Sequence, residues 1–183
     1  MIDPIVKDNR VVFGPCRLSY AHLFEKWQPE GAAGDAKYMT NVLIPKSEKK
    51  TIKAIQDAID ATLKANAAKF KGGKVPAKYD SPLRDGDDKD DELYNGHFYM
   101  NPKSSNRPTV CDKNNQPIND PDEMYSGVWA YVSVSFFAYS VSGNQGIGCF
   151  LNSVRKFKDD ERLGGNTGGA DDFASIIDDD DDL

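Results

Sequence analysis

The strongest alternation of apolar and polar positions in the chain lies between residues 128 and 139. Side chains of a strand point alternately to its two faces. The even-numbered face carries small or apolar residues, namely Val128, Ala130, Val132, Val134, Phe136 and Ala138. The odd-numbered face carries Trp129, Tyr131, Ser133, Ser135, Phe137 and Tyr139. The pattern predicts a strand with its even face in a core and four aromatic rings on its odd face.

The odd face of this strand has two interpretations. Exposed rings on a sheet form a platform for unstacked nucleobases, and each stacked base contributes roughly 1–3 kcal/mol. Alternatively, the face is buried as well, beneath a helix or a partner protein. A register shift of one residue would exchange the two faces and would expose Phe136 and Phe150 instead.

Further strands are predicted on both sides of this one. A turn at residues 142–146 and a strand at 147–157 would complete a hairpin that places Arg155 and Lys156 near Trp129. Other apolar runs predict strands at residues 10–20, with a bulge or bend at Gly14-Pro15, and at 37–44, 97–101 and 107–112. Residues 21–36 are predicted as a loop, in which Trp27 either covers the edge of the core, the interpretation we favour, or reaches toward a ligand.

One helix is predicted, over residues 48–70. Ser47 is the expected cap, and Gly72-Gly73 ends the helix. Apolar residues recur at helical spacing at Ile52, Ile55, Ile59, Leu63 and Ala67. The fold class is therefore mainly β with one long helix.

Composition limits the chain to one domain, or one domain with a tail. It has 183 residues, of which 39% are hydrophobic, and no apolar run approaches the ~18 residues of a membrane span. The start of the chain lacks the pattern of a secretion signal. Three widely spaced cysteines predict buried thiols in a reducing compartment. We therefore expect a soluble intracellular protein.

The net charge of −6 is unevenly distributed along the chain. Residues 171–183 hold seven aspartates and no Lys or Arg; taking these from the 29 acidic residues leaves 22 against 23 basic ones. The Gly-rich segment at 164–169 that precedes them is typical of a flexible linker. The tail itself combines aspartates with apolar residues such as Phe173 and Ile176, a composition that predicts disorder.

No motif of an enzyme or a metal site stands out. The acidic run at residues 84–92 and the one at 112–123 lack the glycine and ligand spacing of a calcium loop. No Walker loop or GxSxG motif is present. We therefore expect neither catalysis nor a cofactor. A metal-dependent nuclease using the acids at 85–92 is a rival that a cleavage assay would test.

Several segments resemble one family, in the same order along the chain. They include VVFGPCRLSYAHLFEKW, LIPKS, PLRDGD, NPKSSNRPTVCD, DPDEMYSGVWAYVSVSFFAYS, GIGCFLNSVRKF and ERLGG before the acidic tail. These are similar to the OB-fold single-stranded DNA-binding proteins of tailed bacteriophages, which are distantly like the single-stranded DNA-binding protein of phage T7. The resemblance covers nearly all of residues 8–165. The chain departs from the T7-like pattern by ending in Leu183 rather than phenylalanine.

The resemblance implies a five-stranded OB barrel with extra hairpins that binds single-stranded DNA (ssDNA) with little sequence preference. It divides the chain into a DNA-binding domain (1–163), a linker (164–170) and an acidic tail (171–183). In such proteins the tail competes with DNA and contacts a polymerase, a helicase or primase, or a nuclease. The expected setting is phage replication, recombination and repair in the host cytoplasm, with a homodimer or a cooperative assembly on DNA left open.

The candidate site residues follow from both lines of reasoning. The stacking candidates are Trp129, Tyr131, Phe137 and Tyr139, followed by Tyr99. The backbone-contacting candidates are Lys103, Arg107, Arg155, Lys156 and Arg17. The tail candidates are Asp178, Asp179, Asp180, Asp181, Asp182 and Leu183. Two alternatives remain: an RNA-binding OB module, and a structural or interaction β-domain whose aromatic face contacts protein.

Overall fold

The computed structural model describes residues 1–164, which form one sheet of nine strands with one α-helix and four short 3-10 helices. The longer strands are β2 (Arg10–Trp27), β3 (Lys37–Pro45), β8 (Trp129–Val141) and β9 (Asn144–Lys158). The shorter strands are β1 (Ile5–Lys7), β4 (Arg84–Asp85), β5 (His97–Met100), β6 (Lys103–Ser104) and β7 (Thr109–Cys111). The predictions for residues 165–183, which cover the tail and nearly all of the linker, lie outside the described residues.

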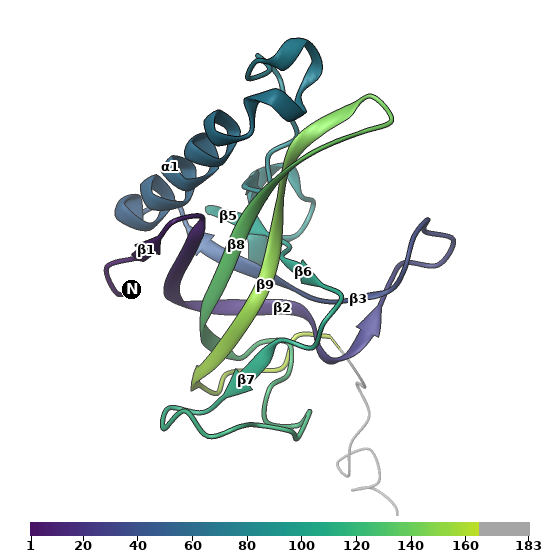
Figure 1. Ribbon diagram of the computed structural model, residues 1–183. Helices are drawn as coiled ribbons and strands as arrows, with labels where there is room; N and C mark the ends of the chain where they lie inside the picture. Colours follow the sequence, from purple (N-terminus) through teal and green to yellow (C-terminus); the bar gives the residue numbers. More distant parts are fainter. Residues whose placement is uncertain (165–183) are drawn as a thin grey trace, which may run out of the picture.

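The strand pairings close into a ring in the order β2–β8–β9–β6–β3 and back to β2 (Figure 1). Strands β1, β5, β4 and β7 extend this ring at its edges. A closed barrel of five strands is the OB-type architecture, so the predicted fold class is confirmed. The weakest link of the ring is β6, which pairs with β9 at a single register position, Lys103 opposite Phe150.

The predicted facing of β8 is confirmed. All six residues of the even-numbered face are buried in the barrel core, from Val128 at 0% exposure to Ala138 at 7%. On the odd-numbered face only Ser133 is buried, and the four aromatic residues are half-buried. The register of β8 therefore directs its rings outward, and the alternative with Phe136 exposed is wrong.

Strand β2 is bent at the predicted position and is longer than predicted. The register with β8 shifts between Phe13 and Cys16. Gly14 at the bend has φ +132°, and a Cβ there would lie 2.8 Å from the Ala130 carbonyl oxygen, so the close approach requires glycine. Residues 21–27, predicted as loop, continue β2. Together with β3 they form an arm that projects from the barrel (Figure 1).

Helix α1 (Lys49–Ala65) lies against β8, β2 and β9. Its buried residues include Ile55, Ile59 and Leu63, as the helical spacing predicted. The prediction of Ser47 as the cap is wrong: Glu48 holds that position, without a side-chain cap hydrogen bond. The helix also ends earlier than predicted, because 3-10 turns replace it from Ala67 onward. None of the helices in residues 1–164 is long and apolar enough to cross a membrane.

Candidate nucleic-acid interface

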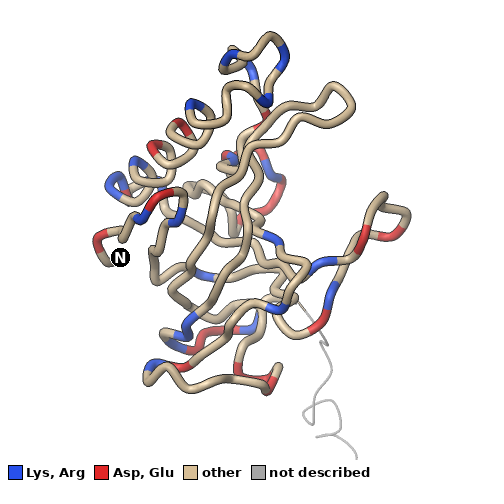
Figure 2. The backbone as a smooth tube through the Cα atoms, in the orientation of Figure 1, with Lys and Arg blue, Asp and Glu red and all other residues tan. Residues whose placement is uncertain are grey.

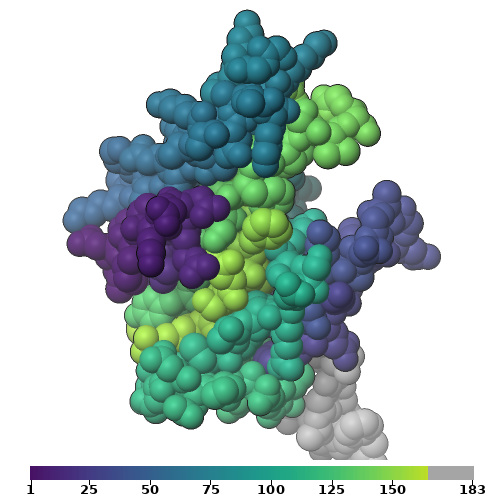
Figure 3. Space-filling view, viewed as in Figure 1, coloured from purple at the N-terminus to yellow at the C-terminus, as the bar shows by residue number. Residues whose placement is uncertain are grey.

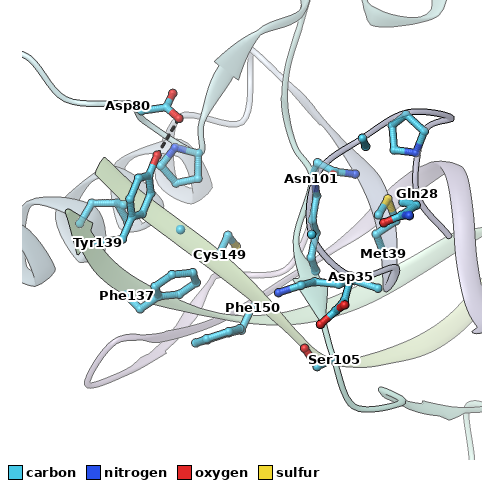
Figure 4. Close-up of a pocket in the computed structure, with 18 of the residues that line it drawn as sticks. Gln28, Asp35, Met39, Asp80, Asn101, Ser105, Phe137, Tyr139, Cys149 and Phe150 are labelled. Atoms are coloured by element: carbon cyan, nitrogen blue, oxygen red, sulfur yellow. Dashed lines mark hydrogen bonds between the residues drawn. The ribbon is translucent and has the colours of Figure 1, made fainter. Parts of the chain in front are cut away.

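A cleft of about 640 Å³ lies between the β2–β3 arm and the β8–β9 hairpin (Figure 4). The arm contributes Trp27, Asp35 and Lys37 to its lining. Asp80, Arg84 and residues between them also line it, as does Lys103, where β6 pairs with β9. Segments that are far apart in sequence therefore meet around one groove.

Aromatic rings of the hairpin form one wall of this cleft. The rings of Phe137 and Phe150 stack, with centroids 4.1 Å apart and planes 25° from parallel. The Tyr139 ring is tilted beside Phe137 at 6.4 Å. Phe150 is 44% exposed, so the stacked pair presents a ring to solvent. Such a surface can accept a planar ligand by stacking.

Two glycines of β9 leave the space that these rings occupy. Gly148 pairs with Phe137 and Gly146 pairs with Tyr139 across the hairpin. A Cβ at Gly148 would lie 2.0 Å from the Phe137 ring, and one at Gly146 would lie 2.6 Å from the Tyr139 hydroxyl oxygen. Each ring therefore lies over the bare backbone of its partner strand, which explains the GIG motif in physical terms.

Cationic side chains also line the cleft and lie near one another. They are Lys37, Arg84 and Lys103. Partial burial lowers the pKa of Lys103, and the neighbouring charges of Arg84 and Lys37 lower it further. Among the ion pairs of residues 1–164, Lys37 and Lys103 take no part, and Arg84 has one loose pair with Asp80 at 3.8 Å. The cluster repels itself and would be stabilised by an anion.

Tyr139 and Asp80 mark one end of the cleft. The Tyr139 hydroxyl donates a hydrogen bond to Asp80 Oδ2 at 2.8 Å (Figure 4). Desolvation, and then this contact with Asp80, raises the pKa of Tyr139 to about 12. The phenol is therefore neutral at physiological pH and adds no negative charge to the groove.

Trp27 also lines the cleft, so our favoured interpretation that it covers the core is wrong. Its side chain is 41% exposed. The indole stacks on His22, with centroids 4.8 Å apart and planes 4° from parallel. A ring held by a neighbour at the base of the arm provides a second stacking surface, opposite the hairpin.

Two further stacking candidates, Trp129 and Tyr131, lie at the other end of β8. Trp129 Nε1 donates to Asp160 Oδ2 at 2.7 Å, and Lys158 Nζ lies 5.1 Å from the Trp129 ring centroid. The Tyr131 ring packs edge-on against Phe157 at 5.6 Å. These rings face outward but lie outside the lining of the cleft.

The cationic candidates near that end contact the chain itself. Arg17 donates to the carbonyl oxygens of Gly127 and Glu161, at 3.2 and 2.8 Å. Arg155 donates to the carbonyl oxygen of Lys113 at 2.5 Å, and Lys156 pairs with Asp159 at 2.8 Å. The hairpin places Arg155 opposite Tyr131, close to Trp129 as predicted.

The remaining candidates, Tyr99 and Arg107, have local partners. Tyr99 packs edge-on against Tyr94 at 5.1 Å, and Lys89 Nζ lies 5.4 Å from its ring centroid. The Arg107 guanidinium lies 5.2 Å from the Phe24 ring centroid and donates to Asn119 Oδ1 at 3.3 Å. Of the predicted set, Phe137, Tyr139 and Lys103 share the cleft. The nucleic-acid roles of all these residues stay predictions.

The acidic run at residues 84–92 folds around a lysine. Lys46 Nζ lies 2.7 Å from Asp85 Oδ1 and 2.6 Å from Asp87 Oδ2. These hydrogen bonds lower the pKa of both carboxyl groups. Asp87 Oδ1 also accepts from the Gly96 amide at 2.8 Å. In residues 1–164, no three His, Cys, Asp or Glu side chains gather as metal ligands would.

Known proteins share both the sequence pattern and the fold. Residues 9–183 match the family model described as the ssDNA-binding protein of Enterobacter phage Enc34. Putative protein p50 of Acyrthosiphon pisum secondary endosymbiont phage 1 is 32% identical over 170 residues, covering 87% of this chain and 90% of that protein.

Solved structures agree with this match. The single-stranded DNA-binding protein of bacteriophage Enc34, in complex with ssDNA, has a TM-score of 0.74 and 26% identity, covering 88% of this chain and 94% of that one. The single-stranded DNA-binding protein gp2.5 of bacteriophage T7 shares the fold, at a TM-score of 0.57 and 16% identity, covering 95% of this chain and 98% of that one. The chain therefore belongs to the ssDNA-binding protein family of phage Enc34.

Proposed function

We propose that this protein binds single-stranded DNA, without sequence preference, in the cleft between the β2–β3 arm and the β8–β9 hairpin. The observation that carries the proposal is the exposed Phe137–Phe150 stack, which lines the same cleft as Lys37, Arg84 and Lys103. Rings beside cations are the combination that binds unpaired strands. The role is non-enzymatic: the protein covers ssDNA during phage replication, recombination and repair in the host cytoplasm.

The contacts in the cleft divide into two kinds. Bases stack on Phe150, Phe137 and Tyr139, and because every base has a π-face, stacking tolerates any sequence. Phosphates contact the cationic cluster, which relieves its self-repulsion and releases counterions from the DNA. Binding should therefore weaken as salt rises. The likeness to a relative solved with ssDNA supports this assignment.

The acidic tail is part of the proposal. Asp178 to Asp182 and Leu183 compete with DNA for the cationic cleft and, when displaced, recruit a polymerase, a helicase or primase, or a nuclease. The support is the charge partition of the sequence, with seven aspartates in residues 171–183 of a chain whose remaining charges nearly balance. Tethering keeps the tail at a high local concentration, so it displaces weak ligands before strong ones.

Intrinsic tryptophan fluorescence tests the proposal, because the two tryptophans of the chain lie in different places. Trp27 lines the cleft and Trp129 does not. In the Trp129→Phe variant, titration with oligo-dT at two salt concentrations should change the Trp27 signal saturably, with weaker binding at higher salt. The Trp27→Phe variant is the matched control and should respond much less.

A flat titration of both variants, with no gel shift of oligo-dT, would refute ssDNA binding. A fluorescence response from Trp129 alone would place the bound DNA at the other end of β8, outside the cleft. Parallel gel shifts with duplex DNA and with RNA of the same sequence test the RNA-binding alternative: equal or tighter RNA binding would overturn the assignment to DNA.

A further inference from the structure

The segment after α1 carries a concentrated positive charge. Five lysines and no acidic residues lie between Asp60 and Asp80. They are Lys64, Lys69, Lys71, Lys74 and Lys78, all exposed, and within residues 1–164 none of them takes part in an ion pair. Figure 2 shows blue positions gathered on this end of the molecule. We call residues 64–78 the lysine segment.

The lysine segment is fixed to the β8–β9 hairpin. The Lys71 amide donates to Gln145 Oε1 at 2.8 Å. Just after the segment, the Asp80 amide donates to the Gln145 carbonyl oxygen at 2.9 Å, and the Ile147 amide donates to the Asp80 carbonyl oxygen at 3.0 Å. Phe70 is 3% exposed and anchors the segment to the core. Figure 3 shows the hairpin tip beside this segment.

A second hollow connects this segment to the cleft. It has a volume of about 600 Å³ and is lined by residues that include Lys78, Asn144 and Gly143. Tyr139 and Asp80 line both this hollow and the cleft. The cleft therefore continues past the Tyr139 ring, and its continuation leads to Lys78 and the lysine segment.

We propose that the lysine segment is a second binding site for nucleic-acid phosphates, which a strand occupies as it leaves the cleft past Tyr139. The proposal rests on the proposed function and extends it beyond the stacking site. Lysines bind phosphates as point charges, without fixed geometry. A row of lysines can therefore bind the phosphates of a DNA backbone by charge alone. The segment would lengthen the site without reading any base.

The expected effect is a change in salt dependence. Each phosphate neutralised on a single strand contributes about −0.7 to the slope of log K against log salt. Removing four lysines should make this slope shallower by about 3. Between 50 and 200 mM salt, the unchanged protein should then lose about 50-fold more affinity for long strands than the variant loses.

The test uses full-length protein and an oligo-dT ladder, followed by fluorescence anisotropy. The variant replaces Lys64, Lys69, Lys71 and Lys74 by Gln. A charge-matched control replaces four lysines beyond the other end of α1 or at its start, namely Lys7, Lys49, Lys50 and Lys53. Circular dichroism and thermal unfolding compare the folding of the two variants, since all eight positions are exposed.

The expected result is a defect that depends on length. Strands that fill only the cleft should bind the variant, the control and the unchanged protein alike, while longer strands should bind the variant more weakly, with the shallower slope. If even the unchanged protein fails to bind short strands, the proposed function fails. If short strands bind normally and long strands bind variant and control equally, only this inference fails.

The acidic tail is the competing occupant of the lysine segment. Repeating the titrations with Asp178 to Asp182 replaced by Asn separates the two. If the lysines contact DNA, their defect persists in this background. If the defect disappears there, the segment binds the tail instead, and the inference is overturned.

Discussion

Replacing Phe150 by alanine removes the more exposed ring of the cleft. Phe150 is 44% exposed and stacks on Phe137 at 4.1 Å. A stacked base contributes about 1–3 kcal/mol. Because the Phe137 ring remains, we expect a loss near the lower end of this range. A loss of about 1.4 kcal/mol corresponds to a tenfold increase in the Kd for ssDNA.

The Phe150→Ala variant should remain folded. Truncating a fully buried Phe costs about 3–5 kcal/mol. Phe150 is almost half exposed and lies outside the buried core, so its loss should lower the free energy of unfolding by less than about 2 kcal/mol. Denaturant titration of the variant would check this value before binding is measured.

Phe157→Ala provides a matched control on the same strand. Phe157 is 49% exposed and packs edge-on against Tyr131, at the other end of β9. Anisotropy with labelled oligo-dT, at two salt concentrations, compares both variants with the unchanged protein. We expect the larger loss for Phe150→Ala. Equal losses of affinity in the two variants would place the bound DNA along the whole hairpin. An unchanged Kd for Phe150→Ala would refute stacking in the cleft.

Four further predictions concern groups around the cleft. Gly148→Ala places a Cβ 2.0 Å from the Phe137 ring, so it should destabilise the fold by about 1–3 kcal/mol and weaken ssDNA binding. Denaturant titration measures the first effect and anisotropy the second. Unchanged stability and affinity would contradict the argument that the ring requires a glycine beneath it. Replacing Asp178 to Asp182 by Asn should tighten ssDNA binding, most at low salt, and identical binding across salt would contradict tail competition. Because the pKa of Lys103 is lowered, this lysine loses its charge at a lower pH than an ordinary lysine, so ssDNA affinity should begin to fall earlier as pH rises. The Lys103→Arg variant should keep its affinity over that range. Overlapping pH profiles of the two proteins would disprove this role of Lys103. The pKa of Tyr139 is raised from 10 to about 12, so its contribution to stability should be complete below about pH 10 and lost as pH rises through 12; an ordinary pKa for Tyr139, measured as the tyrosinate absorbance missing from Tyr139→Phe, would contradict this.

The fold was predictable where the pattern is local. Alternation along β8 identified which side chains enter the core, and helical spacing identified Ile55, Ile59 and Leu63. Both periodicities are properties of a single element. By contrast, β6 contains two residues, and no pattern in two residues indicates a strand that completes a barrel.

The site was predictable in part, for a related reason. Among the residues that line the cleft, Phe137, Tyr139 and Lys103 were predicted candidates because their rings or charge stand out within their own segments. Lys37 and Arg84, which also line the cleft, were not among the candidates, since they come from different strands that meet only after the barrel closes. The sequence pattern indicated an exposed Phe150 only if the register of β8 shifted by one residue, and the structure does not show that shift. Side chains alternate between the two faces of a strand, but the register between β8 and β9 shifts between Ser133 and Val134. This shift changes which residues of β9 lie opposite the residues of β8.

The partners of Arg17 and Trp129 were also beyond the sequence. Both side chains contact Asp160, which follows β9 at a distance of more than 30 residues from Trp129. A tryptophan and an arginine on the outer face of a sheet suggest a ligand when they are considered alone. The structure shows that the chain itself occupies their polar groups.

The two-residue strand β6 belongs both to the barrel and to the lining of the cleft. Lys103 pairs with Phe150 at the one register position that links β6 to β9, and the same two side chains face the cleft. Because this single position joins β6 to β9, a distortion of the backbone at Lys103 or Phe150 would open the barrel and change the shape of the cleft at the same time.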